Sequence, residues 1–216
     1  MAVSFPPETL SPAEWFARFR QRFDLAASDP VTELGVFYDR HIRVERGPSS
    51  ETELRSEYAT TEWNSIMSGL LGELARDYGF YQTTDPSSRQ DLLWFRPVEP
   101  MSLAAMIVQE DQATEAVTEL EVPHVVSGAA ELGVLVLYPD HPMPDGARDL
   151  EEATEVWKRK VESELAQRPP SRDFLLLTLG TNSWELPSLW RGFAWDGSAH
   201  RLQPLRGTEG PAPGLA

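Results

Sequence analysis

Residues 132–138, LGVLVLY, form a continuous apolar run, and this stretch decides the fold. An apolar run of this length without alternation is typical of a strand that is buried on both faces of a sheet. An amphipathic pattern over Asp149–Gln167 follows and predicts a helix, and a second apolar run, Phe174–Leu179, predicts another buried strand. A strand, a helix and a second buried strand in this order indicate a crossover connection within a sheet that is covered by helices.

The region before this run predicts a long helix, three strands and a further helix. Apolar residues recur at three- and four-residue steps from about Glu51 to Tyr78, and Gly79 stands where a helix usually ends. Short apolar runs then predict strands at 80–83, 91–95 and 103–110, and a helix at 114–126 that Pro123 ends or kinks. Hairpin-like strands followed by crossover helices predict an α/β fold with a mixed central sheet and helices on both sides.

Both ends of the chain carry clear local signals. Residues 11–14, SPAE, predict the start of an N-terminal helix, with a capping serine, a proline in the first turn and a capping-box glutamate. The stretch Val31–Val44 fits neither a helix nor a strand period, so it stays open between the two. Asp196-Gly197 between two short runs predicts a C-terminal hairpin. We expect residues 1–205 to form a single α/β domain and the Gly- and Pro-rich residues 206–216 to be a disordered tail.

The composition narrows the classes of function. The 216 residues include no cysteine, which excludes disulfides, thiolate metal sites and a cysteine nucleophile. No segment has the pattern of a signal peptide or is long enough to span a bilayer, so a soluble, cytoplasmic protein without membrane association is expected. The formal charge of −15 repels nucleic-acid backbones at long range. Contact with DNA would need a local basic groove or a bridging metal ion, and a basic protein partner is equally compatible.

Common catalytic motifs are missing from the sequence. No glycine-rich dinucleotide or Walker A motif and no Gly-x-Ser-x-Gly elbow is present. The four histidines are scattered without the spacing of metal ligands. One polar pattern remains to be weighed: Asp91 opens a predicted strand, and the next predicted strand ends in residues 109–112, QEDQ.

These two strands are joined by a short turn and are therefore expected to be antiparallel neighbours. Alternate residues of a strand share a face, so an acidic side chain from each strand can converge on one hard cation. Oxygen ligands suit Mg²⁺, and a metal ion held in this way could polarise a phosphodiester and activate water. A register shift of one residue would instead pair Gln109 with Asp111 and leave no glutamate in the key place.

In this layout the sequence resembles the PD-(D/E)XK nuclease superfamily, which has the restriction-endonuclease-like fold. Asp91 matches the Asp of the family, and Glu110-Asp111-Gln112 matches its Glu-x-Lys. The motif is degenerate, because Gln112 stands in the place of the lysine and carries no charge. The resemblance covers roughly Glu51–Leu179 and rests on the order of the elements and three polar positions.

The resemblance implies a Mg²⁺-dependent phosphodiester hydrolase that acts on nucleic acid. Asp91 and Glu110 would bind the metal ion, and Gln112 would position the attacking water. In this family an acidic residue on the preceding helix often completes the site, and here Glu73 is the first candidate and Glu62 the second. The alternative for both residues is a solvated charge on a helix face, which is the commoner outcome.

A second function class stays open beside the nuclease. The missing lysine and the strong negative charge favour a catalytically degenerate, non-enzymatic domain that binds a protein, such as a basic one, through its acidic surface. The C-terminal tryptophans could stack on bases, but packing of the hairpin over the sheet is the simpler expectation. Arg191 and Arg201 lie near them and could contact phosphate, whereas ion pairing with the abundant acids is the alternative.

Overall fold

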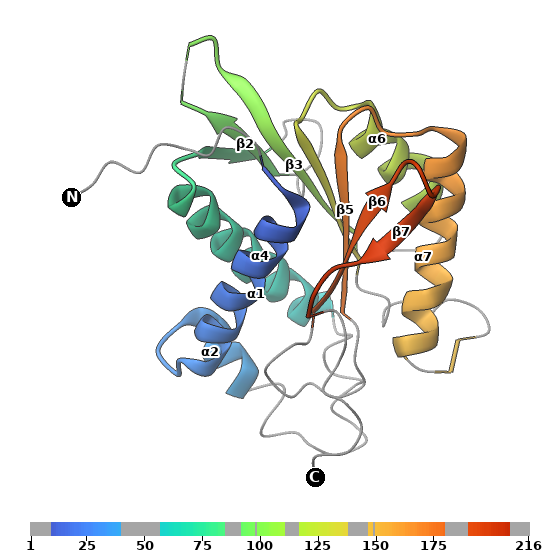
Figure 1. Cartoon of the computed structure of the whole chain (residues 1–216). Helices are drawn as coiled ribbons and strands as arrows, with labels where there is room; N and C mark the ends of the chain where they lie inside the picture. The colour runs from blue at the N-terminus through green and yellow to red at the C-terminus, as the bar shows by residue number, and fades with distance from the viewer. Residues whose placement is uncertain are drawn as a thin grey trace.

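The computed structural model contains a seven-stranded mixed sheet with helices on both faces (Figure 1). It describes residues 10–39, 57–84, 92–97, 99–110, 117–137, 147–148, 150–179 and 190–207, with only the backbone of 57–61, 110, 118, 150 and 179. The strands are β1 (Tyr81–Thr84), β2 (Leu92–Arg96), β3 (Ser102–Glu110), β4 (Leu132–Leu137), β5 (Asp173–Leu179), β6 (Trp190–Asp196) and β7 (Arg201–Pro204). The helices are α1 (Pro12–Ser28), α2 (Glu33–Tyr38), α4 (Glu57–Asp77), the π-helix η2 (Val117–Glu121), α6 (Val122–Ser127) and α7 (Leu150–Gln167).

The strands lie in the sheet in the order in which they occur in the sequence. The first three strands form an antiparallel meander, β3, β4 and β5 are parallel, and β6 and β7 complete the sheet as an antiparallel hairpin. All three central strands therefore end at the same edge, which we call the carboxyl edge, and begin at the opposite amino edge. In open α/β sheets, ligands usually bind in the crevice outside the carboxyl ends of the parallel strands.

Two hydrophobic clusters cover the two faces of the sheet. On one face, α1, α2 and α4 pack through a cluster that is rich in aromatic residues and includes Trp15, Phe19 and Trp94. On the other face, α6 and α7 pack through a smaller cluster that includes Trp157 and Phe174. Every residue of β4 is buried, as its uninterrupted apolar sequence predicts. The predicted α/β class, with a mixed sheet and helices on both sides, is confirmed.

The predicted element positions agree closely with the structure in the described parts. The long helix is present as α4, and Gly79 follows it with a φ of 74°, as expected of a glycine that ends a helix. Two backbone hydrogen bonds close this end, from the amide of Gly79 to the carbonyl of Arg76 and from Phe80 to Ala75. Within the described part of the chain, no helix is both long and apolar enough to cross a membrane.

Local predictions at helix starts need two corrections. Pro12 does begin α1, but the Ser11 side chain makes no capping hydrogen bond, and Glu14 binds Arg18 instead of completing a capping box. In the undecided stretch Val31–Val44, the described residues form the short helix α2. The Thr32 hydroxyl caps this helix by accepting a hydrogen bond from the amide of Gly35 at 2.9 Å.

Two other predicted elements differ in detail. The helix predicted at 114–126 is divided into the π-helix η2 and the helix α6, which begins at Val122. Pro123 lies in the first turn of α6, where its missing N–H group is tolerated. The C-terminal hairpin is confirmed, but four residues rather than an Asp-Gly pair connect its strands. Asp196 organises this loop by accepting hydrogen bonds from Ser198 and Ala199, and the Ser198 hydroxyl is the main cause of its lowered pKa.

Candidate functional site

The two strands predicted to carry the acidic pair are antiparallel neighbours, as expected. Leu92, which follows Asp91 in the sequence, pairs with Ile107, three residues before Glu110. Glu110 is the last residue of β3, and its backbone pairs with Leu137 at the end of the parallel strand β4. Asp91 and Gln112 lie outside the described residues, as does the side chain of Glu110. Their convergence on a metal ion therefore stays a prediction.

The register of β3 can be followed up to Gln109. Met106 and Val108 belong to the α6/α7 cluster, whereas Ile107 belongs to the α1/α4 cluster. Because side chains two residues apart share a face, Gln109 faces α1 and α4 together with Ile107. Gln109 is buried, with 3% of its surface exposed. It is therefore on the opposite face of the sheet from Val108.

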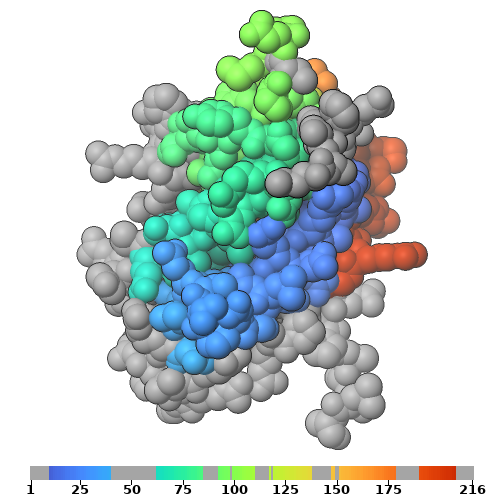
Figure 2. Space-filling view, turned by 90° about the vertical axis from the view of Figure 1, so that its left-hand side faces the viewer, coloured from blue at the N-terminus to red at the C-terminus, as the bar shows by residue number. Residues whose placement is uncertain are grey.

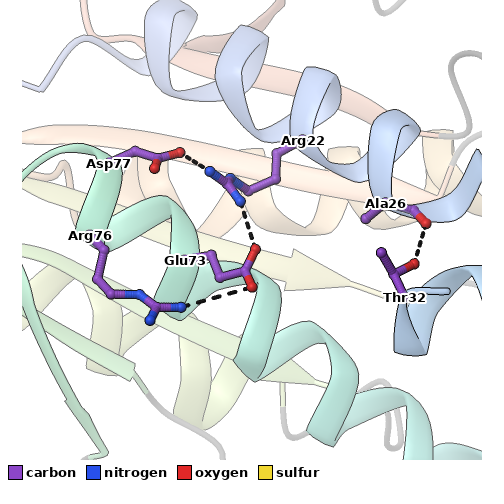
Figure 3. Close-up of polar contacts among 6 residues, drawn as sticks. All are labelled: Arg22, Ala26, Thr32, Glu73, Arg76 and Asp77. Atoms are coloured by element: carbon purple, nitrogen blue, oxygen red, sulfur yellow. Dashed lines mark hydrogen bonds and ion pairs between the residues drawn. The ribbon is translucent and has the colours of Figure 1, made fainter. Parts of the chain in front are cut away.

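Glu73 lies in a groove between α1 and α4 and is held there by an arginine (Figure 3). Arg22 donates to Glu73 at 2.6 Å through Nη1 and to Asp77 through Nη2, and Arg76 approaches Glu73 at 3.8 Å. The groove has a volume of about 510 Å³ and opens on the face shown in Figure 2. It is lined by Arg18, Gln21, Arg22, Leu25, Ala26, Asp29, Thr32, Glu73, Leu74 and Asp77. A guanidinium group thus occupies the space between the two carboxylates of α4.

This groove is remote from the end of β3. The strand β1 runs in the same direction as β3, so it begins at the amino edge. Near its start, the Gln82 amide donates a hydrogen bond to the carbonyl of Ser68 and lies against Gly72. Glu73, the next residue of α4, therefore lies near the amino edge. Glu62 lies eleven residues earlier on α4, about 16 Å nearer the carboxyl edge at 1.5 Å per residue. Of these two acidic residues, Glu62 therefore lies nearer to the carboxyl edge.

No metal-binding cluster involves the side chains that the structure describes. Among them, no three His, Cys, Asp or Glu residues gather closely enough to hold a metal ion. Of the four site residues predicted from the sequence, only Glu73 is described as a side chain, and it is engaged by Arg22, so the predicted cluster stays a prediction.

The C-terminal tryptophans and arginines are the residues that the sequence offers for contacts with bases and phosphates. Trp190 is buried and packs edge-on against Phe19 and Phe23 of α1 with ring centroids 5.1 and 5.6 Å apart, so it is a core residue. The expected packing of the hairpin over the sheet is wrong, because β6 and β7 pair with β5 and extend the sheet itself. Arg191 lies 3.7 Å from Glu151 of α7, so the expected ion pair is present. Trp184 lies outside the described residues.

One buried ion pair had no signal in the sequence. Arg96 at the end of β2 donates to both carboxylate oxygens of Glu131, from Nε at 2.9 Å and from Nη2 at 2.7 Å. These hydrogen bonds are the main cause of the raised pKa of Arg96. The two residues are 35 positions apart and meet only because β2 ends at the amino edge, where β4 begins.

Comparison with known proteins adds no family assignment. The sequence matches no model of a known protein family, and no curated protein is significantly similar to it. The functional argument therefore depends on the geometry and chemistry of the chain itself.

Proposed function

We propose that this chain is a nuclease-like protein that holds a divalent metal ion at the carboxyl edge of its sheet. Asp91 and Glu110 would be the metal ligands, and Gln112 would position the attacking water. The pairing of Leu92 with Ile107 carries the proposal, because it brings the strand that follows Asp91 beside the strand that ends at Glu110. The roles of the individual residues come from the resemblance to the PD-(D/E)XK superfamily.

The order of the elements also supports this proposal. A long helix, three antiparallel strands, a helical crossover and a parallel strand follow one another from α4 to β4. This is the order that the resemblance implies. The end of β3 also lies where open α/β sheets usually bind their ligands.

The chemistry assigned to this edge is metal-assisted hydrolysis of a phosphodiester. A metal ion between two carboxylates would polarise the phosphate and lower the pKa of a bound water. A glutamine can orient that water by hydrogen bonding, but it cannot offset developing negative charge as a lysine does. We therefore expect any cleavage of nucleic acid to be slow, and metal binding to be the more sensitive measurement.

Calorimetry with Mg²⁺ and Mn²⁺ tests the proposal. We expect the wild-type chain to bind a divalent ion and both Asp91→Ala and Glu110→Ala to abolish the binding. Glu164→Ala on α7 is the matched control, because it removes one carboxylate from a helix outside the proposed site. Unchanged binding in both site variants would remove the metal site, and with it the nuclease proposal.

A second candidate function is protein binding without catalysis, and the α1/α4 groove favours it. The groove contains Asp29 and Asp77, and Leu25 on its lining exposes 66% of its surface to solvent. A basic segment of a partner protein could place an aliphatic stem on Leu25 and its charge beside Asp29, and it would compete with Arg22 for Asp77. The net charge of −15 would speed the encounter with such a partner.

Binding of a lysine- and arginine-rich peptide, followed by NMR, tests this second candidate. We expect shifts to concentrate on the groove residues and binding to weaken in Asp77→Asn and Leu25→Ser. Glu164→Gln removes the same charge elsewhere and is expected to bind normally. Shifts spread evenly over the acidic surface, with equal weakening in all three variants, would contradict a specific groove.

A further inference from the structure

Thr178 and Arg191 face each other across two neighbouring strands at the carboxyl edge. Thr178 of β5 pairs with Arg191 of β6, two residues along from the pair of Leu176 and Phe193. Leu176 and Phe193 belong to the cluster beneath α6 and α7, so Thr178 and Arg191 face the same side of the sheet. Directly opposed residues have Cβ atoms about 5 Å apart. Their side chains are therefore close enough to bind one small ligand between them.

Both side chains carry hydrogen-bonding groups that no described residue engages. Thr178 has no exposed surface, and its hydroxyl finds no hydrogen-bond partner within the described part of the chain. The Nε atom of Arg191 is also buried and has no partner there. Buried polar groups are nearly always paired, because an unpaired one loses its water without compensation. Two such donors on opposed residues indicate a position that a ligand completes.

The ion pair of Arg191 with Glu151 does not satisfy the guanidinium. The separation of 3.7 Å exceeds a hydrogen-bond distance, and the Glu151 side chain is 70% exposed. Lys158, whose Nζ lies 5.4 Å from the Phe193 ring centroid, pairs in the same way with the half-exposed Glu155. Arg191 and Lys158 are thus largely buried, whereas their acidic partners are more exposed.

The first turn of α7 adds to the positive character of this position. Helix N-termini present free backbone N–H groups and the positive end of the helix dipole. Of the two acidic residues in this turn, Glu152 is already bound by Arg148, which donates to it from its backbone amide and its guanidinium at 2.9 Å. Glu151 is therefore the acidic residue that an incoming anion has to displace.

We propose that Arg191 and Thr178 form an oxyanion-binding site for a phosphate or carboxylate group. The guanidinium of Arg191 supplies a planar pair of donors that matches either group, and the Thr178 hydroxyl donates a further hydrogen bond. The site takes its ligand through direct hydrogen bonds and needs no metal ion. It lies at the same edge of the sheet as the end of β3 but does not depend on the proposed function of Glu110.

Titration of the full chain with inorganic phosphate, and separately with acetate, tests the site. We expect saturable binding of at least one anion, and the tighter of the two identifies the ligand class. Arg191→Gln should weaken binding at least about tenfold, because a charged hydrogen-bond donor is lost. Thr178→Val should weaken it several-fold while preserving the shape of the side chain and the charge of Arg191.

Arg201→Gln is the matched control, since it removes the same charge from the exposed strand β7. This variant should bind the anion as the wild type does. Equal weakening in Arg191→Gln and Arg201→Gln would show that only net charge matters and would overturn the proposal. The absence of saturable binding of both anions to the wild type would also overturn it. Because neither anion requires a metal ion, these outcomes are independent of the metal titration of Asp91 and Glu110.

Discussion

Two arginines at opposite edges of the sheet are similarly buried but differ in how they are paired. The side chains of Arg96 at the amino edge and Arg191 at the carboxyl edge are 10% and 15% exposed. Arg96 makes two short hydrogen bonds to Glu131 and lies over the ring of Phe80 at 5.1 Å. Arg191 only approaches Glu151, and its Nε has no partner among the described residues.

The difference separates a structural arginine from an available one. A bidentate arginine–carboxylate pair fixes the orientation of both side chains and leaves few donors for a ligand. An arginine with a distant, exposed partner keeps most of its donors, and its local pair contributes little to stability. Among the described residues, Arg96 at the amino edge is therefore satisfied by the carboxylate of Glu131, whereas Arg191 at the carboxyl edge keeps donors that are not engaged.

Breaking the pair at the amino edge should give the largest effect. Glu131→Ala leaves the buried Arg96 without its carboxylate, and we expect a loss of about 3 kcal/mol in the free energy of unfolding. Urea denaturation followed by tryptophan fluorescence measures this loss. Glu164→Ala is the control for removal of a helix-surface carboxylate and should change stability by less than about 0.5 kcal/mol. A similarly small loss in Glu131→Ala would show that the two arginines do not differ as proposed.

Raising the pH should weaken the packing next to the amino edge. Burial is the main cause that raises the pKa of Tyr78 to about 12, and its ring stacks on Phe80. A pKa above the unfolded value of 10 stabilises the folded state fully below pH 10, and this contribution is lost as the pH rises towards 12. The stability difference between the wild type and Tyr78→Phe should change across this window and stay constant below it. A constant difference up to pH 12 would indicate that water reaches the phenol.

The sequence predicts the elements of this fold better than it predicts the contacts between them. The three- and four-residue spacing of apolar residues located α4, and the continuous apolar run located β4, because burial selects the side chains along each element directly. The pairing of Arg96 with Glu131 depends on which strand ends meet in the sheet. The two residues are 35 positions apart, so no local sequence pattern predicts their contact. The same limit applies to Glu73, whose place near the amino edge follows from the direction of α4 relative to the sheet.

The register of β3 shows that the sequence also leaves open which face of the sheet a side chain takes. Alternation predicts that Gln109 and Val108 lie on opposite faces, but only the packing of Ile107 with the α1/α4 cluster shows which face each one takes. The opposed pair of Thr178 and Arg191 was likewise beyond prediction. Arg191 could be singled out as a cation near the hairpin, whereas Thr178 became relevant only through its position opposite it in the sheet.

A smaller and opposite effect is expected at the carboxyl edge. Thr178→Val removes a buried hydroxyl that makes no hydrogen bond within the described residues, so its desolvation cost disappears. We expect stability to stay equal or to rise by up to about 1 kcal/mol, while binding of the oxyanion weakens. Urea denaturation without added anion separates these two effects. A loss of more than about 1 kcal/mol would mean that the hydroxyl is satisfied in the folded protein, which would contradict its availability to a ligand.

Glu151→Gln should have the smallest effect on stability and should leave Arg191 more available to an anion. The Glu151 side chain is 70% exposed and 3.7 Å from Arg191, so its removal should change the free energy of unfolding by less than about 0.5 kcal/mol. It also removes the negative charge that competes for the guanidinium, so phosphate or acetate should bind about threefold more tightly. Parallel anion titrations of the wild type and this variant at low ionic strength measure the gain, which added salt should reduce. Weaker binding in Glu151→Gln would mean that the carboxylate positions Arg191 for the ligand, and Glu151 would then play the role for Arg191 that Glu131 plays for Arg96.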